Sequence, residues 1–199
     1  AMYFSTANPC MKYGGVMGES KVKILKSIHS AFLPVTVYAR RGVGLAQVED
    51  MMRSAGLRYP VIVKPDRGER GRGVELIHGK DGLCAYHRLI KEDYLIQEFI
   101  DLPVELGILY YRYPGHNRGN ISSVTKKEFL TVEGDGSSTI GVLVQSKLRA
   151  RFRLHYLKDK FADQWEDILP EGKSLLLEPI GNHSRGTVFY DARELISAR

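Results

Sequence analysis

Residues 59–73, YPVIVKPDRGERGRG, form the most informative stretch of this chain. The run 59–64 is rich in β-branched residues, which is typical of a buried strand, and it ends at Lys64. Glycines follow at 68, 71 and 73, and backbone N–H groups near glycine can approach an anion closely. The stretch therefore predicts a phosphate cradle with Lys64 at the sheet edge. A Gly-rich hairpin tip with solvated arginines fits the same residues equally well.

Two better-known phosphate motifs do not match. GGVMGESK, residues 14–21, resembles a P-loop, but Glu19 and Ser20 separate Gly18 from Lys21, whereas that loop needs Gly-Lys-Ser/Thr in sequence. In 59–73 the glycines precede an expected strand, whereas a dinucleotide-binding fingerprint opens a helix. Any phosphate site here belongs to another class.

Composition and charge limit the class of protein. The chain has 199 residues, 43% of them hydrophobic, with a formal charge of +6 and a pI of about 9.3, which suggests an anionic partner such as a nucleotide, an acidic substrate or nucleic acid. No apolar run approaches the ~20 residues of a membrane span, and no secretory signal is present. Cys10 and Cys84 match no disulfide or metal pattern. We expect a cytoplasmic protein with free thiols and no membrane partner.

Hydrophobic periodicity predicts two α+β lobes, 20–100 and 101–199, joined near Asp101. Expected helices cover 20–32, 46–56, 81–92 and 138–151, with Ser20 and Ser138 as N-caps. Expected strands cover 34–40, 59–64, 74–77, 94–100, 104–113, 120–132, 175–180 and 187–191. A basic cluster at Lys147, Arg149, Arg151 and Arg153 is interpreted as a solvated helix face.

A second candidate site lies about 33 residues after Lys64. QEFI, residues 97–100, ends a predicted strand between the lobes, and Glu105 follows it. Such a strand can offer backbone N–H and C=O groups to an adenine edge, and a carboxylate beyond it can bind ribose hydroxyls. Any exposed strand end with two acidic residues would fit this pattern. The segment is informative because of its position in the chain, about 33 residues after Lys64.

Several segments, taken in order, resemble the ATP-grasp superfamily, in its D-alanine–D-alanine ligase-like and cyanophycin-synthetase-like branch. They are ESK at 19–21, LPVTVY at 33–38, YPVIVKPDRGERGRGVELI at 59–77, YLIQEFI at 94–100, VELGILYYR at 104–112 and TKKEFLTVEGDGSSTI at 125–140. The resemblance covers roughly residues 20–145 and implies an ATP-grasp fold with a nucleotide cleft between its lobes. Residues 20–100 would be the small (lid) subdomain and 101–199 an incomplete large subdomain.

The resemblance also assigns site residues. It implies that Lys21 contacts nucleotide phosphate, although Ser20 stands where the family has Asp, and that Lys64 bridges adenine and the α-phosphate. The loop that closes over the β- and γ-phosphates would contain Gly68, Arg70, Gly71 and Gly73. The adenine hinge would be Gln97, Glu98, Phe99 and Ile100, with Glu105 as the ribose-binding acid. Lys126 or Lys127 would reach the nucleotide from the second lobe as a catalytic cation.

The family's magnesium ligands are not matched. ATP-grasp ligases hold Mg²⁺ with an Arg-x-Asp and then a Glu-x-Asn pattern, and carboxylate oxygens suit this ion. Here Glu178 and Asn182 are four apart, and Arg193-Glu194 lacks the Asp. We therefore expect the chain to be a truncated fragment whose metal ligands lie beyond Arg199. We expect one of two roles for Asn182, His183 and Arg185: they contact phosphate or substrate, or they form a polar loop between strands. Arg185 is a further candidate catalytic residue.

These features predict the ATP-binding part of an ATP-dependent carboxylate–amine or carboxylate–thiol ligase that acts through an acyl phosphate. Its ligands would be ATP, Mg²⁺ and a small carboxylate or amine, and we expect no nucleic-acid partner. The parent protein would be a ligase, and this fragment alone would be inactive. One alternative is a catalytically inactive ATP-grasp pseudoenzyme. Another is a basic nucleic-acid-binding module, which the sequence disfavours because aromatic residues are not interleaved with its basic runs.

Overall fold

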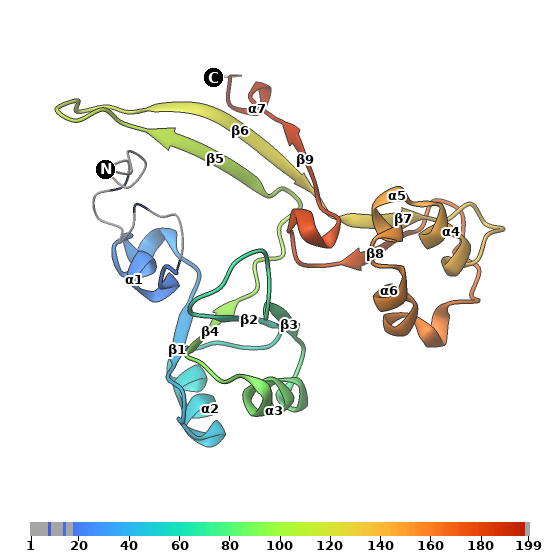
Figure 1. The fold of residues 1–199 in the computed structure, drawn as a ribbon, viewed down its shortest axis with the longest axis horizontal. Helices are drawn as coiled ribbons and strands as arrows, with labels where there is room; N and C mark the ends of the chain where they lie inside the picture. Colours follow the sequence, from blue (N-terminus) through green and yellow to red (C-terminus); the bar gives the residue numbers. More distant parts are fainter. Residues whose placement is uncertain (1–7, 9–13, 15–17, 198–199) are drawn as a thin grey trace. The chain divides into compact units, whose positions relative to one another are not determined.

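The chain divides into two compact units, which the computed structural model describes over residues 8, 14 and 18–197. The first unit comprises Ala1–Asp101 and the second Leu102–Arg199 (Figure 1). Both units contain α-helices and β-sheet, which confirms the predicted α+β class. None of the helices in the described part of the chain has the length and apolar character of a membrane span.

The first unit is built on an antiparallel four-stranded sheet. Its strands are β1 (Thr36–Ala39), β2 (Val61–Pro65), β3 (Glu75–Ile77) and β4 (Tyr94–Glu98), in the order β1-β4-β2-β3. Along β2, burial alternates, so that Val61 and Val63 are fully buried while Ile62 and Lys64 face the other side. This alternation places Lys64 on the sheet face opposite the core.

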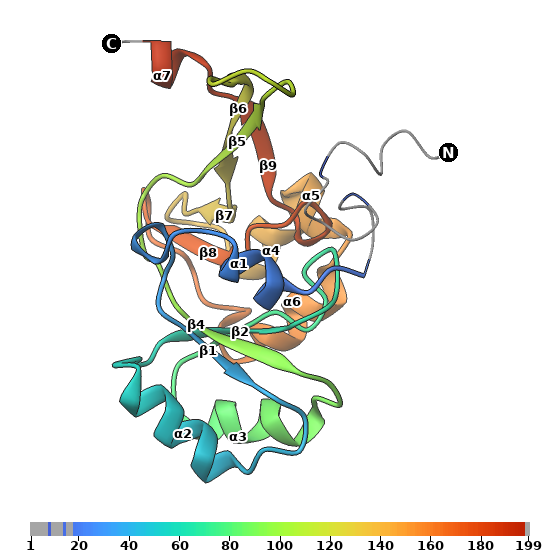
Figure 2. The ribbon, with the colours of Figure 1, turned by 90° about the vertical axis from the view of Figure 1, so that its left-hand side faces the viewer.

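Two helices cover the core side of this sheet. They are α2 (Leu45–Ser54) and α3 (Lys80–Leu89), which lie on the same face in Figure 2. Val48 and Met52 of α2 and Leu83 and Tyr86 of α3 are buried against β2 and β4. Their spacing of three to four residues is that of an amphipathic helix, as the sequence predicts. Helix α1 (Lys21–Lys26) and the loop between β2 and β3 lie on the other face of the sheet.

The first predicted helix is much shorter than expected. Instead of covering 20–32, α1 spans Lys21–Lys26, and a 3₁₀ turn, η3 (Ser30–Phe32), follows it. Ser20 caps α1, as predicted, by accepting a hydrogen bond from the Lys23 N–H. No residue of α1 is fully buried, and Phe32 is 82% exposed, so the expected apolar stripe is only partly covered rather than packed into a core. Without such packing a helix of this length gains little from propensity alone.

The second unit contains two small antiparallel sheets. One consists of β5 (Leu106–Tyr111), β6 (Asn120–Glu128) and β9 (Val188–Asp191), and the other of β7 (Leu130–Glu133) and β8 (Ser174–Glu178). The prediction of a single strand over 120–132 was wrong, because the strand is interrupted at Phe129. Residues before the break pair with β5 and β9, whereas residues after it pair with β8.

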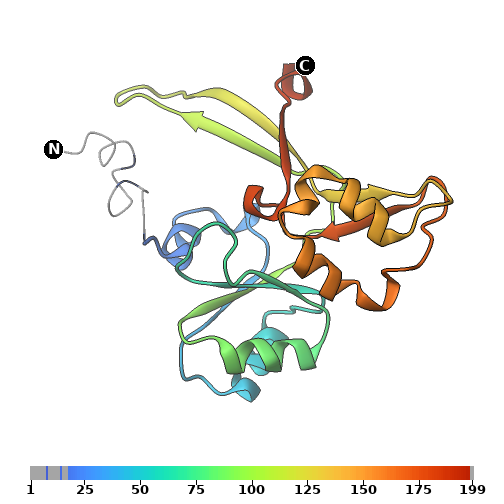
Figure 3. The same cartoon turned by 45° about the vertical axis from the view of Figure 1, so that its right-hand side comes forward.

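Three short helices pack beside β7 and β8, as Figure 3 shows. They are α4 (Ile140–Ser146), α5 (Leu148–Arg151) and α6 (Leu154–Lys160). The continuous helix predicted over 138–151 is interrupted at Lys147, whose backbone is extended. Thr139 caps α4 in place of Ser138, which instead donates to Asp135. The core of the unit includes Val144, Leu157 and Leu177.

Three short segments complete the unit. These are the 3₁₀ turns η4 (Ala162–Gln164) and η5 (His183–Arg185) and the helix α7 (Glu194–Ser197). The turn η5 belongs to the loop that runs from β8 to β9, where the sequence places Asn182, His183 and Arg185.

Candidate functional site

Lys64 is held by a chain of three hydrogen bonds across the first unit's sheet. Its Nζ donates to Gln97 Oε1 at 2.7 Å, and Gln97 Nε2 donates to Thr36 Oγ1 at 2.7 Å. Thr36 in turn donates to the Pro34 carbonyl at 2.9 Å. The chain crosses from β2 through β4 to β1, because these strands are adjacent in the order β1-β4-β2. It fixes the ammonium of Lys64 on the sheet face opposite the core.

Lys21 is the second cation on this face. Its Nζ donates to the carbonyls of Asp66 at 3.3 Å and Gly68 at 3.1 Å. Burial lowers the pKa of Lys21, with Asp66 opposing the shift. Burial also lowers the pKa of Lys64, and the positive charge of Lys21 lowers it further. Two desolvated ammonium groups that repel each other make a location at which an anion is favoured.

Asp66 explains why Lys21 lies here. Asp66 Oδ1 accepts hydrogen bonds from the Ser20 hydroxyl at 3.0 Å and from the Val22 N–H at 2.9 Å, and the residue is only 8% exposed. A carboxylate that accepts N–H groups in the first turn stabilises a helix start. Asp66 thus joins the start of α1 to the end of β2. Asp66 lies within the stretch 59–73 but was not among the predicted site residues.

The glycine-rich loop has an unusual backbone. Gly68, Gly71 and Gly73 all have positive φ, and so does Arg70, at 56°. Gly73 is additionally crowded, because a Cβ there would lie 2.8 Å from Pro65 Cγ. The Tyr86 hydroxyl donates to the Gly73 carbonyl at 2.8 Å, which ties this end of the loop to α3. Of these residues only Arg70 and Gly71 are consecutive, and turn conformations of this kind can present backbone N–H groups to an anion, as in a nest.

The four predicted hinge residues have different positions. Gln97 and Glu98 are the last residues of β4, which pairs with β1 on one side and β2 on the other. The Glu98 N–H donates to the Val35 carbonyl, and its carboxylate accepts the Val35 N–H at 3.2 Å. Phe99 and Ile100 lie past the end of the paired strand. Backbone groups of the hinge are therefore more available at Phe99 and Ile100 than at Gln97.

In the second unit, Lys127 and Glu105 form an ion pair with each other. The Lys127 N–H also donates to the Glu105 carbonyl at 3.0 Å. Lys126 is next to Lys127 in β6, where it pairs in register with Leu106 and Tyr190. Both lysines line a cavity of about 630 Å³ together with Tyr190 and Asp191. Of the two cations that the sequence leaves open, Lys127 is the one paired with another predicted site residue.

Arg185 is bonded to a buried carboxylate. Its Nη1 lies 3.4 Å from Glu178 Oε1, and Arg153 contacts Glu178 Oε2. Glu178 is 1% exposed at the end of β8, and the Ile180 N–H also donates to it at 3.2 Å. For Arg153 the solvated-face interpretation was wrong, because its side chain is only 19% exposed. The sequence gives no pattern that joins Arg153, Glu178 and Arg185, which are brought together by the packing of α6 on β8.

The residues described do not fit a magnesium site. Within residues 8, 14 and 18–197, no group of three or more His, Cys, Asp or Glu side chains gathers in a way that could hold a metal ion. Glu178, the carboxylate nearest to the family pattern in sequence, is already bonded to two arginines.

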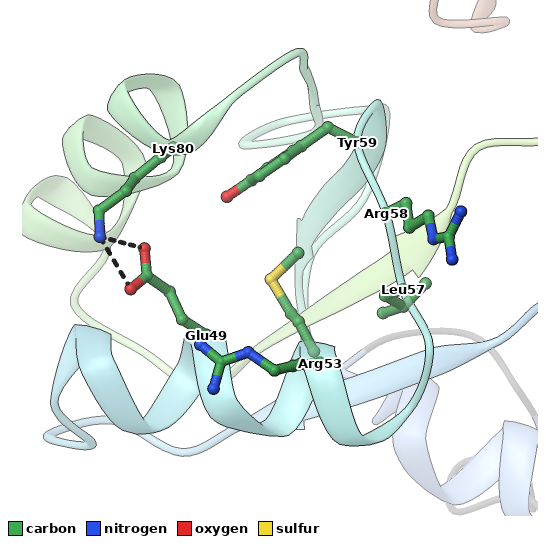
Figure 4. A pocket seen from close by; sticks show the side chains of 7 residues that line it. Glu49, Arg53, Leu57, Arg58, Tyr59 and Lys80 are labelled. Atoms are coloured by element: carbon green, nitrogen blue, oxygen red, sulfur yellow. Dashed lines mark hydrogen bonds and ion pairs between the residues drawn. The ribbon is translucent and has the colours of Figure 1, made fainter.

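A separate pocket of about 450 Å³ lies on the helix side of the first unit (Figure 4). Tyr59 forms one wall, and the Lys80–Glu49 ion pair closes another, with N–O distances of 3.0 Å. Arg53 and Arg58 also line it. This pocket contains none of the predicted site residues.

Cys84 of α3 is a free cysteine and half-buried, whereas Cys10 lies outside the described residues.

Neither a protein-family model nor a curated protein sequence matches the chain. Solved structures match parts of it. VanG D-Ala:D-Ser ligase from Enterococcus faecalis is 22% identical with a TM-score of 0.40, over 58% of this chain and 33% of that one. N5-carboxyaminoimidazole synthetase from Staphylococcus aureus, complexed with ADP, is 14% identical with a TM-score of 0.47, over 72% and 40%. D-Alanine-D-alanine ligase from Helicobacter pylori is 14% identical with a TM-score of 0.41, over 81% and 57%.

All three matched proteins are ATP-dependent ligases of the ATP-grasp type, the superfamily that the sequence motifs resemble. The chain spans 33% to 57% of their lengths. The three matches are partial, with TM-scores from 0.40 to 0.47.

Proposed function

We propose that this chain binds ATP and forms the nucleotide-binding part of an ATP-dependent carboxylate–amine or carboxylate–thiol ligase. The observation that carries the proposal is the position of Lys64, which Gln97 fixes at 2.7 Å on the sheet face opposite the core, where the positive charge of Lys21 acts on it. Two ammonium groups beside a loop of left-handed residues suit an oligophosphate better than a neutral ligand. The order of the sequence motifs around this pair supports the same assignment.

Each predicted residue then has a role. Lys64 and Lys21 bind phosphate oxygens, and the loop Gly68–Gly73 covers them with backbone N–H groups. Phe99 and Ile100 offer backbone groups to the base, while the Glu105 carboxylate accepts hydrogen bonds from the ribose hydroxyls. By the resemblance to the ATP-grasp superfamily, Lys126 or Lys127, together with Arg185, stabilises negative charge at the reacting phosphate.

The proposed reaction has two steps. A carboxylate oxygen of the first substrate attacks the γ-phosphorus of ATP, the bond to the bridging oxygen breaks, and ADP leaves with an acyl phosphate formed. The nitrogen or sulfur of the second substrate then attacks the acyl carbon, loses a proton and expels inorganic phosphate. The chain's cations would contribute by positioning the phosphates and stabilising charge.

Titration of the 199-residue chain with a non-hydrolysable ATP analogue in a calorimeter tests the binding step. Lys64→Met should weaken affinity about tenfold or more, since hydrogen bonds to charged groups contribute roughly 1.5–3 kcal/mol. Lys91→Met is the matched control, because Lys91 is an exposed lysine of the same unit, and it should change affinity less than about twofold. Equal affinity in the wild type and Lys64→Met would overturn the assignment.

A further inference from the structure

Asp66, the residue after strand β2, accounts for the first three backbone N–H groups of helix α1. Such groups have no carbonyl partner within a helix. The Lys21 N–H donates to the Asp66 carbonyl at 3.0 Å, and the Val22 N–H donates to Asp66 Oδ1 at 2.9 Å. The Lys23 N–H donates to Ser20 Oγ at 3.2 Å, and the Ser20 hydroxyl donates in turn to Asp66 Oδ1 at 3.0 Å. Asp66 thus satisfies the start of α1 directly or through Ser20.

Helix α1 gains little stability from its own length or packing. It spans only six residues, Lys21–Lys26, and none of them is fully buried. A helix this short is unstable in water without tertiary packing. Asp66 itself is well fixed, since it is 8% exposed and its N–H donates to the Asp93 carbonyl at 2.8 Å. Its carboxylate also suits the partial positive charge of a helix start. The position of Lys21 in the first turn therefore follows from Asp66.

The side chain of Lys21 is held by the same residue. Its Nζ donates to the Asp66 carbonyl at 3.3 Å and to the Gly68 carbonyl at 3.1 Å. In this position its positive charge acts on Lys64. Burial lowers the pKa of Lys21, and Asp66 is the charge that opposes this shift most strongly. Both the backbone and the ammonium of Lys21 are thus bonded to Asp66.

The negative charge of Asp66 makes its presence beside Lys21 informative. A carboxylate here repels a phosphate group, so by charge alone it would weaken the binding of an anion. Its hydrogen bonds to the start of α1 act in the opposite direction, because they fix the lysine before a ligand arrives and reduce the entropy lost on binding. The two effects predict opposite changes in anion affinity when the carboxylate is removed.

We propose that Asp66 is a positioning residue of the nucleotide site, which holds Lys21 in place through the start of α1. This inference rests on the function proposed above and adds a residue to the site. Asp66 does not bind the nucleotide itself. Its effect on affinity passes through Lys21 and requires that lysine to be present.

Calorimetric titration of the 199-residue chain with a non-hydrolysable ATP analogue tests the proposal. Asp66→Ala should weaken binding about fivefold or more, although it removes a negative charge. Glu92→Ala is the matched control, because Glu92 is exposed and its charge also acts on Lys21. It should leave the affinity unchanged or raise it by less than about threefold. Asp66→Asn keeps an acceptor oxygen for Val22 and Ser20, so it should weaken binding less than Asp66→Ala does.

A second pair of variants shows whether Asp66 acts through Lys21. Lys21→Met should weaken binding about fivefold or more. Asp66→Ala added to Lys21→Met should then cause less than about a further twofold loss, because the group that Asp66 positions is already absent. Amide hydrogen exchange of the ligand-free proteins separates this effect from unfolding. In Asp66→Ala the Val22 amide should lose protection while the amides of β2 and β4 keep theirs.

Several results would overturn the positioning role. These are an Asp66→Ala protein that binds as tightly as Glu92→Ala, an Asp66→Asn protein as weak as Asp66→Ala, an equally large loss in the Lys21→Met background, and a general loss of protection in β2 and β4. In each of these cases the wild type still binds the analogue. A wild type that does not bind it would overturn the proposed function together with this inference, so the two failures are distinguishable.

Discussion

The ammonium of Lys64 and the side-chain amide of Gln97 are joined by a 2.7 Å hydrogen bond between adjacent strands. Gln97 is itself held by Thr36, so its carbonyl oxygen points to Lys64 in a fixed orientation. The two residues are 33 positions apart in sequence, and the β2–β4 pairing makes them neighbours. Lys64 is therefore oriented before any ligand arrives, which reduces the conformational entropy lost on binding.

Gln97→Met should weaken binding of a non-hydrolysable ATP analogue about three- to tenfold while Lys64 is still present. The variant removes the acceptor that orients the ammonium but keeps the length of the side chain. Gln47→Met is a suitable control, because Gln47 is an exposed glutamine on α2 in the same unit. Calorimetry on the three proteins checks the result. Analogue binding as tight in Gln97→Met as in the wild type would contradict the orienting role.

Lys64→Met should have little effect on folding, although we expect it to weaken nucleotide binding about tenfold or more. Burial lowers the pKa of Lys64 from its ordinary value of 10.5, so the protonated side chain costs stability at neutral pH. In the window between the lowered pKa and 10.5, the unfolded chain binds more protons than the folded one, and stability rises with pH. As pH rises toward 10.5, the free energy of unfolding of the wild type should therefore increase relative to that of Lys64→Met.

Urea denaturation of both proteins at several pH values up to 10.5 measures this difference. A wild type that loses stability relative to Lys64→Met across that window would show that the ammonium is stabilised, not penalised, by its surroundings.

Gly73→Ala should destabilise the first unit more than Gly42→Ala. Both glycines have positive φ, 66° and 84°, and a left-handed conformation costs a non-glycine residue roughly 1–2 kcal/mol. A Cβ at Gly42 meets nothing within 4 Å, whereas at Gly73 it would lie 2.8 Å from Pro65 Cγ. The expected losses are about 1 kcal/mol for Gly42→Ala and about 2–4 kcal/mol for Gly73→Ala. Chemical denaturation compares them, and equal losses would mean that Pro65 moves aside freely.

Asp135→Ala should make the turn before α4 less stable at neutral pH and less sensitive to acid. Asp135 accepts hydrogen bonds from the hydroxyl and N–H of Ser138 and from the N–H of Ser137, and these lower its pKa below the ordinary 3.8. A lowered pKa contributes stability that is present above the unfolded value and is lost as pH falls through the folded one.

The wild type should thus lose more stability than Asp135→Ala between pH 5 and pH 2, as measured by thermal unfolding. Parallel acid curves for the two proteins would exclude this carboxylate as a source of the acid dependence.

Glu178→Gln should lower the free energy of unfolding by about 3 kcal/mol, because it removes the negative partner of two poorly solvated guanidinium groups. Glu133→Gln makes the same chemical change at an exposed residue of β7 and should cost less than about 0.5 kcal/mol. Urea denaturation of both variants gives the comparison. A Glu178→Gln protein as stable as the wild type would show that the arginines do not depend on this carboxylate.

Local patterns in the sequence were sufficient for much of the first unit. The run 59–64 and the segment 94–100 are strands because their β-branched and apolar residues suit a sheet that is buried on one face. Helix α2 was predicted because Val48 and Met52 repeat with helical spacing. The helix predicted over 20–32 is shorter in the structure, because its apolar residues repeat correctly but are only partly covered, so that only the capped first turns are helical.

Contacts between residues that are distant in the chain could not be predicted from the sequence. No local pattern shows that residues 120–132 split at Phe129, because the split arises from which strands are available to pair on either side. The Arg153–Glu178–Arg185 contacts likewise depend on α6 lying beside β8. Thr36 and Asp66 were missed as site residues for the same reason.

The sequence by itself determined that Lys64 ends a buried strand and that glycines follow it, because strand propensity and glycine's backbone freedom are local properties. It also determined the order of the motifs on which the resemblance to ATP-grasp ligases rests. Only the tertiary structure decided that Lys64 is fixed by Gln97 and Thr36, that Asp66 holds the start of α1 and with it Lys21, and that Arg153 and Arg185 both contact Glu178. Contacts between different strands, helices and loops depend on strand order and helix packing, which no single stretch of the chain specifies.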